Sequence, residues 1–573
     1  MKNLFLILTF IISLNLNIQG QNCQYLVVCP DNEEMRQWAD TLARFRNEQG
    51  ISTKVINIDE IGDNNPSVLR DYFEDIYNNC DLVPSAILLF GDYSDDNTKG
   101  ITSFYIRNNF DNNIKYLSDN KLVDFDYDNL PEICIARMPA ANAQQAELMV
   151  RKTMNYEKFP SLNPNYYNHP VTAMGFDESR WFQLCSEIIA GYFEKIGKSP
   201  TRLNSINNGT PDSVWSTNAN TNKIINYFGP KGLNYIPNDI RYLTEWDATN
   251  HNISSAINDG TFLVQHRSHG TFQTWDNPDF TNNDINNLNN KDLTFIMSAN
   301  CQTGDFGYGE GDNDCFAERF LRVENGAVAV VAASQLSYSF VNDTYVWGFY
   351  DYLWNDFMPY GNNETSFKYP AFANDYGKYF LKQSLWPNNS IYKDITYNLF
   401  HYFGDAYLQL NTELPQHIAI DYPKEISTSC ASFVIRKDKD TRVALSVDGE
   451  LIATSFGEDS IVVIEPFYKE GKIKIVATKQ DHFRHEDFIE VRSSLNDSDL
   501  NIYPNPVKDI LFVEGKGIMR VDVYNSSGQK LMEINNSGDT ERIEINCNML
   551  KKGLFHLDII YEDRRVGKSF IVM

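Results

Sequence analysis

The chain has few basic residues, no closely paired cysteines and no membrane-length apolar run in its body. Its nine cysteines include no CxxC pair, which argues against a zinc ribbon, and their density is too low for a disulfide scaffold. Acidic residues outnumber basic ones by 76 to 50, giving a formal net charge of −26. Such a chain offers no basic surface to neutralise phosphates, so nucleic acid and anionic membranes are disfavoured as partners.

Beyond the N-terminus, no stretch reaches the ~18–20 consecutive apolar residues that a membrane helix needs. The N-terminus itself carries Lys2, then an apolar stretch from Leu4 to Leu14, then small or polar residues. This order is typical of a secretory signal peptide, which we place at residues 1–20. We therefore expect an exported protein with no membrane span in the mature chain.

The chain that follows the signal peptide is long enough to form several hydrophobic cores. At 573 residues and 42% hydrophobic content, several folded domains are expected. Strand-like apolar runs alternate with amphipathic helical patterns over residues 24–160, and the same order resumes over 165–412. Alternation of this kind favours parallel sheets covered by helices. We predict an α/β fold with two subdomains over these ranges.

Two β-rich units are expected after the α/β region. Residues 416–492 contain short strand patterns separated by turn residues, with no helical pattern between them. Their number and spacing predict an immunoglobulin-like β-sandwich. After a polar linker, residues 499–573 show a second set of alternating strands, which predicts a C-terminal all-β unit.

Two of the apolar segments end at reactive side chains. TFLVQHRSHG (261–270) runs to His269 and Gly270, and LTFIMSANC (293–301) runs to Cys301. Catalytic groups of open α/β sheets collect at the carboxyl ends of such strands. A thiol and an imidazole at one sheet edge are the parts of a cysteine nucleophile and its base. The sequence therefore favours a cysteine peptidase.

Metal binding is the alternative chemistry at these motifs. His266 and His269 have the spacing HxxH, but residues three apart on a strand face opposite sides, so one zinc ion is not expected to take both. The segment GYGEGDNDC (307–315) is rich in oxygen ligands. It could hold calcium through Asp312 and Asp314, or it could be a solvated loop.

Several motifs together resemble a known family. SANCQTGDF is followed by DCFAERFLR and GAVAVVAAS, and an HG pair ends the preceding apolar strand. In this order they resemble the gingipain family of cysteine peptidases, over about residues 24–410. The sandwich at 416–492 is similar to the immunoglobulin-like domain that follows the gingipain catalytic domain. LNIYPNP and the final GKSFIVM resemble the sorting domain of proteins exported by the type IX system of Bacteroidetes.

The resemblance implies a caspase-like α/β/α sandwich and a set of roles. Cys301 would be the nucleophile and His269 the general base and acid. The backbone N–H groups of Gly270 and Cys301 would form the oxyanion hole. A carboxylate orients the histidine in this family, and Asp177 or Glu178, in MGFDES, is the candidate here.

Substrate contacts and partners are also implied by the resemblance. Asn300, next to the nucleophile, and Asp343, in VNDTYVW, are the candidate substrate-binding residues. Asp343 matches an aspartate that lines the first pocket of lysine-specific members, which implies a basic P1 preference. No cofactor is required, although calcium is possible. The expected partners are protein or peptide substrates and the type IX machinery.

The expected location is the medium or the cell surface, reached through the periplasm and outer membrane. The catalytic region starts almost directly after the signal peptide, without the long propeptide typical of gingipains, so their activation route is not predicted here. Two other functions stay open: a surface binding or adhesion protein on an inactive peptidase scaffold, and a sortase-like transpeptidase.

Overall fold

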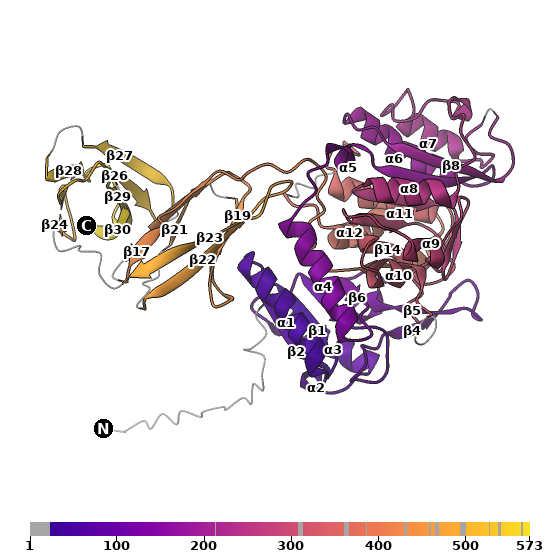
Figure 1. The fold of residues 1–573 in the computed structure, drawn as a ribbon, viewed down its shortest axis with the longest axis horizontal. Helices are drawn as coiled ribbons and strands as arrows, with labels where there is room; N and C mark the ends of the chain where they lie inside the picture. Colours follow the sequence, from indigo (N-terminus) through magenta and orange to yellow (C-terminus); the bar gives the residue numbers. More distant parts are fainter. Residues whose placement is uncertain are drawn as a thin grey trace, which may run out of the picture.

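A ten-stranded sheet organises the first two thirds of the protein, and two β-rich units follow it (Figure 1). The structure is a computed structural model that describes residues 23–573, with gaps at 213, 308–312, 360–365, 386, 429–432, 458–459, 464–468, 493–499, 527, 537–539 and 563–564. The expected signal peptide lies outside the described residues. Among those residues, no helix is both long and apolar enough to cross a membrane.

The strands of the sheet run in two opposite groups. In spatial order they are β2 (Thr53–Asn57), β1 (Tyr25–Cys29), β3 (Ala86–Phe90), β6 (Cys134–Met138), β15 (Phe400–Phe403), β14 (Ala327–Ala333), β13 (Thr294–Ser298), β9 (Leu263–Arg267), β7 (Val171–Asp177) and β8 (Thr201–Asn208). Neighbours pair in parallel throughout, except that β14 and β15 are antiparallel. The two halves therefore share one sheet rather than forming two separate ones, with β15 joining the first half.

Helices cover both faces of the sheet, as a parallel sheet requires. On one face α1 (Glu33–Glu48), α4 (Ala143–Lys158), α10 (Phe316–Arg322), α9 (Asn282–Asn286) and α8 (Asn250–Asp259) pack in succession. On the other lie α6 (Phe182–Lys195), α11 (Val341–Leu353), α12 (Pro370–Gln383) and α13 (Ser390–Leu399). Further described helices are α2 (Ile58–Ile61), α3 (Pro66–Asn79), α5 (Pro164–Asn168) and α7 (Thr221–Phe228), with 3-10 turns η2 (Asp119–Leu122) and η3 (Ile240–Tyr242).

Local sequence accounts for where the first helices begin. The side chain of Asn32 accepts hydrogen bonds from two backbone N–H groups in the first turn of α1. Asn65 caps α3 in the same way, and Pro66 occupies its first position. These caps satisfy N–H groups that a helix leaves without partners, and a first-turn proline loses no hydrogen bond. An asparagine before each helix is the signal in the sequence that marks where the helix begins.

The unit after the sheet consists of two β-sheets packed face to face. One contains β16 (Ile420–Asp421), β18 (Phe433–Lys437) and β21 (Ser460–Val463). The other contains β17 (Glu425–Ser427), β23 (His485–Arg492), β22 (Gly471–Thr478), β19 (Arg442–Val447) and β20 (Glu450–Ser455). Inward-facing Ile435, Leu445 and Ile475 are fully buried between them. The sandwich is thus present, while its immunoglobulin-like identity stays a prediction.

The C-terminal unit is also all-β and has its own core. A three-stranded sheet holds β24 (Asn501–Tyr503), β25 (Ile510–Glu514) and β28 (Arg542–Asn546). A four-stranded sheet holds β27 (Lys530–Asn535), β26 (Arg520–Asn525), β29 (Gly553–Ile560) and β30 (Arg565–Val572). Leu511, Val523 and Ile559 belong to a hydrophobic cluster that no residue of the other units shares.

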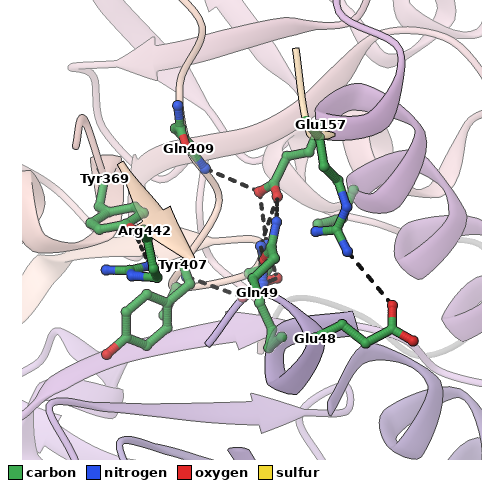
Figure 2. Close-up of polar contacts among 12 residues, drawn as sticks. Glu48, Gln49, Glu157, Tyr369, Tyr407, Gln409 and Arg442 are labelled. Carbon is green, nitrogen blue, oxygen red and sulfur yellow. Dashed lines mark hydrogen bonds and ion pairs between the residues drawn. The ribbon is translucent and has the colours of Figure 1, made fainter. Parts of the chain in front are cut away.

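The sandwich is fixed to the α/β unit by polar contacts (Figure 2). Within the α/β unit, Gln49 donates to Glu157 at 2.6 Å, and Glu157 accepts from the backbone N–H of Gln409 at 3.2 Å. The side chain of Gln409 crosses to the sandwich and donates to the carbonyl of Lys479 at 3.1 Å. From the sandwich, Arg442 donates to the Tyr369 hydroxyl at 3.0 Å. Glu48, at the end of α1, pairs with Lys474 of β22 at 2.6 Å. These contacts hold the sandwich against the α1 side of the sheet.

Candidate active site

Cys301 and His269 follow adjacent parallel strands in matching positions. In the register of β13 with β9, Ser298 lies opposite His266. Cys301 comes three positions after Ser298, and His269 comes three positions after His266. The two residues therefore leave the sheet side by side at its carboxyl edge. The two segments also contact each other after the strands end, because the side chain of Asn300 donates to the backbone carbonyl of His269 at 3.0 Å. The backbones of the two residues that the sequence singled out therefore leave the sheet from neighbouring strands at one edge.

The thiol of Cys301 is half-buried and is held by a loop from the next strand. The backbone N–H of Ser337 donates to Sγ at 3.4 Å, and the Ser337 hydroxyl lies 3.7 Å from it. That hydroxyl also donates to the carbonyl of Asn300 at 3.0 Å and accepts from Asn342, at the start of α11, at 2.7 Å. Ser337 was not predicted, because nothing in the local sequence marks a serine in a loop as a neighbour of a distant thiol.

His269 is half-buried in an environment that disfavours its charged form. Its ring meets Phe182 of α6 edge-on, with centroids 5.3 Å apart. Burial lowers the pKa of His269 below 6.5, and the positive charge of Arg267 lowers it further. The negative charge of Asp177 acts in the opposite direction. A largely neutral imidazole can accept a proton from a thiol.

Gly270 packs closely against the residue before the nucleophile. A Cβ at this position would lie 3.0 Å from the Asn300 Cβ and 3.1 Å from the carbonyl oxygen of Thr274. Gly270 belongs to β10 (His269–Thr271), which pairs with β11 (Thr274–Asp276), and β12 (Phe280–Thr281) completes this small sheet. A larger residue would require these neighbours to shift by a few tenths of an ångström, so glycine suits this close approach.

The two candidate carboxylates near His269 occupy different environments. Asp177, at the end of β7, is buried, and its carboxylate accepts from the N–H and hydroxyl of Ser179 at 2.8 and 2.7 Å. It also accepts from Asn207 at 3.3 Å. Glu178 is exposed. Asp177 thus influences His269 through its charge, without a direct hydrogen bond among the contacts described.

Asp343 and Asn300, the candidate substrate-binding residues, both make internal contacts in the structure. Asp343 is fully buried, accepts from Arg267 Nε at 2.6 Å and from the N–H of Phe340 at 2.8 Å, and so is not a free carboxylate facing substrate. Asn300 is also fully buried, and its amide donates inward to His266 and His269. It lies behind the reactive groups. Arg267 was missed, although a buried arginine between two histidines is visible in the sequence as HRSH.

The proposed calcium segment is only partly described. Asp312 lies outside the described residues. Asp314 is buried, and its two carboxylate oxygens pair with Arg322 at 2.5 Å and Arg319 at 3.1 Å. This carboxylate is therefore already neutralised by arginines. Over the described ranges, one group of three carboxylates, those of Asp124, Asp126 and Asp128, lies within 4.8 Å of one another, outside the predicted segment.

Among the other described cysteines, Cys185 lies against Asp343 and Arg267 but is fully buried, and burial raises its pKa well above 9.0. The eight that the structure describes are free thiols, and only Cys301 and Cys80 among them are not buried. Cys315 is fully buried at the start of α10, and burial raises its pKa well above 9.0. A buried, protonated thiol is a poor nucleophile. Cys301 is therefore the described cysteine best placed for chemistry.

A helix-covered α/β sheet that presents a thiol and an imidazole at one carboxyl edge has the caspase-like architecture. The chain belongs to Peptidase family C25, whose model matches residues 18–411. Residues 501–573 match the secretion system C-terminal sorting domain. The gingipain resemblance seen in the motifs is thereby confirmed, and so is the sorting domain, which marks a protein that is secreted or attached to the cell surface through the outer membrane.

Individual relatives agree with this assignment. The chain is 24% identical over 390 residues to Lys-gingipain of Porphyromonas gingivalis, covering 63% of this chain and 20% of the relative. It is 22% identical over 469 residues to gingipain R2 of the same species, covering 78% of this chain and 54% of the relative. The chain thus spans between a fifth and about half of the length of these relatives.

The fold is also found in solved structures. The crystal structure of the Arg-specific cysteine proteinase gingipain R superposes with a TM-score of 0.67 at 17% identity, covering 82% of this chain and 98% of that one. A complex of the pro- and mature domains of the Porphyromonas gingivalis protein gives 0.66 at 17% identity, covering 82% of this chain and 100% of that one. The caspase-like α/β prediction is confirmed at the level of the fold.

Proposed function

We propose that the protein is an exported cysteine endopeptidase that uses Cys301 as nucleophile and His269 as general base and acid. The observation that carries this proposal is the register of β9 with β13, which places the two groups on neighbouring strand ends. Membership of a peptidase family supports it independently.

The chemistry follows from the groups in place. His269 takes the proton of the Cys301 thiol, and the sulfur attacks the substrate carbonyl carbon, whose oxygen becomes negatively charged. The N–H groups of Gly270 and Cys301 are the candidate donors to that oxygen, and one such donor contributes about 2.7–4 kcal/mol. His269 then gives its proton to the leaving amine. Water, deprotonated by His269, cleaves the resulting thioester and restores the thiol.

The dyad is tested by two substitutions and one control. Cys301→Ala should abolish peptide hydrolysis and labelling by peptidyl electrophiles, and His269→Ala should do nearly the same, because members of a catalytic unit are not additive. Cys80→Ala, at the other described cysteine that is not buried, should keep both activities. Labelling that survives in Cys301→Ala would refute the assignment. If the parent protein joins the acyl group to an added amine more often than to water, the transpeptidase alternative is favoured. If the parent protein shows no activity, the adhesion alternative is favoured.

The P1 preference depends on whether Asp343 stays paired with Arg267 when substrate binds. We propose that the pair cancels the charge of Asp343, so that the parent enzyme shows no strong preference for Lys or Arg at P1. Asp343→Asn should then leave the ratio of kcat/KM for basic and apolar P1 substrates unchanged, because a fully buried, paired carboxylate does not contact the substrate. A P1 substrate panel on both proteins decides this. If the parent enzyme already favours basic P1 residues, this proposal is wrong, and the result supports the lysine-like preference implied by the resemblance.

A further inference from the structure

A second histidine, His266, lies directly behind the proposed catalytic residues. Its side chain is fully buried and stacks flat on Trp275, with ring centroids 4.4 Å apart and planes 8° apart. Trp275 is itself held in place, because its indole N–H donates to Ser298 at 2.8 Å and its ring packs on Phe316. His269 contacts Phe182 instead, on the opposite face of the sheet. His266 is thus a rigidly held group that the proposed reaction does not use.

The hydrogen bonds of Asn300 fix the chemical state of this histidine. The Asn300 amide nitrogen lies 3.0 Å from the His269 carbonyl oxygen and 2.6 Å from Nδ1 of His266. A backbone carbonyl can only accept, so the NH2 group of Asn300 must face it. Nδ1 of His266 must then accept the other N–H, which places the ring proton on Nε2. Burial lowers the pKa of His266 to about 3, in agreement with an uncharged ring.

The contact with the His269 carbonyl also sets the direction of the next N–H. The carbonyl of His269 and the N–H of Gly270 belong to the same planar peptide unit and point in opposite directions. Holding the carbonyl therefore holds that N–H as well. The close packing of Gly270 on Asn300, 3.0 Å from a Cβ added to the glycine, leaves this peptide little room to rotate.

We propose that His266 and Asn300 are positioning residues: His266 holds the Asn300 amide, which holds the His269–Gly270 peptide so that its N–H faces the substrate oxyanion. This inference rests on the proposed peptidase function, since it explains how one donor of the oxyanion hole is kept in place. Preorganised donors cost no reorganisation during the reaction, whereas a donor free to rotate loses much of its effect.

The central test replaces His266 by phenylalanine, which keeps a flat ring on Trp275 but removes the acceptor. His266→Phe should lower kcat by roughly 10–100-fold and leave KM nearly unchanged, because the lost interaction acts on the transition state. Asn300→Asp, which sets a carboxylate against the His269 carbonyl, should lower kcat at least as much. The double variant should be no worse than Asn300→Asp alone, as expected for residues that act in one unit.

A pair of inhibitors separates positioning from general damage. A peptidyl aldehyde adds to Cys301 and develops charge on its oxygen, so its affinity should fall with kcat in both variants. Iodoacetamide alkylates the thiol by displacement of iodide and develops no oxyanion, so its rate should stay at the parent value. The matched control is His556→Phe, a fully buried histidine in β29 of the C-terminal unit, which should keep the parent kinetics.

The possible results are distinct. Parent kcat and aldehyde affinity in His266→Phe would overturn the positioning role and leave the dyad intact. Equal losses in alkylation and turnover would overturn it too, because they would indicate a disrupted site. A parent enzyme that neither turns over peptides nor binds the aldehyde would overturn the peptidase proposal and this inference with it.

Discussion

At the scale of single residues, the charges around His269 tune its protonation. Burial and Arg267 lower the pKa of His269, while Asp177 raises it. Because His269 must be neutral to accept the thiol proton, activity is lost as the pH falls through its pKa. The charge of Asp177 therefore moves the acid limb of the pH profile to higher pH, against the larger effect of burial.

Replacing each carboxylate by its amide decides which of Asp177 and Glu178 raises the pKa of His269. Asp177→Asn removes the negative charge that favours the imidazolium, so the acid limb of kcat/KM should move to lower pH. Glu178→Gln is the matched control, because Glu178 is exposed and should leave the limb in place. The measurement is kcat/KM against pH for both variants. A larger shift in Glu178→Gln would reverse the assignment.

Asp343 shows how a residue can match a family position and yet make different contacts. Its carboxylate lies at the start of α11, where an acidic residue is favourable, and the sequence alone supports that placement. Its buried pairing with Arg267 joins residues 76 positions apart. That pairing depends on how β9 lies against α11, which no local pattern records.

At the scale of elements, α11 is a helix that an amphipathic pattern does not predict. Nearly all of its residues are buried, including Tyr345 and Phe349, so it has no polar face and no helical periodicity of burial. It packs closely against α12 at Gly377, where α12 has no side chain. A Cβ on Gly377 of α12 would lie 2.8 Å from the carbonyl oxygen of Tyr345, closer than real Cβ contacts allow.

Gly377→Ala tests this close helix approach. Alanine favours a helix over glycine by about 1 kcal/mol, so the substitution would stabilise a helix with open space around it. Here the backbone of α11 blocks the methyl group, and overpacking of this kind costs roughly 1–3 kcal/mol. We expect a lower midpoint of thermal unfolding. Ser255→Ala on the exposed face of α8 is the control and should not lower the midpoint, and an unchanged or raised midpoint in Gly377→Ala would contradict the close packing.

At the scale of the whole molecule, Arg436 and Arg565 both join the sandwich to the C-terminal unit. Arg436 of β18 donates to Asp522 at 2.8 Å and to Asp558 at 2.9 Å. The two aspartates are buried and lie directly opposite each other on β26 and β29. A guanidinium between two facing carboxylates offsets their mutual repulsion, so Arg436 stabilises the contact between the units.

Removing this arginine should loosen the C-terminal unit. Arg436→Met leaves two buried carboxylates poorly paired, which costs up to about 3–5 kcal/mol, and less here because Arg520 and Lys530 also lie near Asp522. We expect faster amide hydrogen exchange in β26 and β29.

The pH dependence of this effect has a defined sign. Burial raises the pKa of Asp558, so its charged form destabilises the folded unit, and that penalty is lost as the pH falls through the raised pKa. The defect of Arg436→Met should therefore shrink at acid pH. The control is Arg565→Met, which breaks only a partly exposed pair with Asp421 worth about 0–1 kcal/mol. Equal exchange in both variants would contradict the role of Arg436.

The sequence by itself determined the local features of this protein. Buried strands appear as short apolar runs, and helices with one buried face appear as 3.6-residue patterns with caps. The alternation of strands and helices over residues 24–160 and 165–412 could therefore be predicted. The thiol and the imidazole were identified for the same reason, because a strand end is visible where an apolar run stops. The sorting domain and the peptidase family were likewise recognisable from short ordered motifs.

Only the tertiary structure decided which distant residues meet. It placed β15 beside β6, so that two predicted subdomains share one sheet, and it neutralised Asp343 with Arg267. It also turned Asn300 inward to His266. The physical reason is that ion pairs and buried hydrogen bonds depend on the packing of elements far apart in the chain, whereas periodicity and capping depend on neighbours within a few residues.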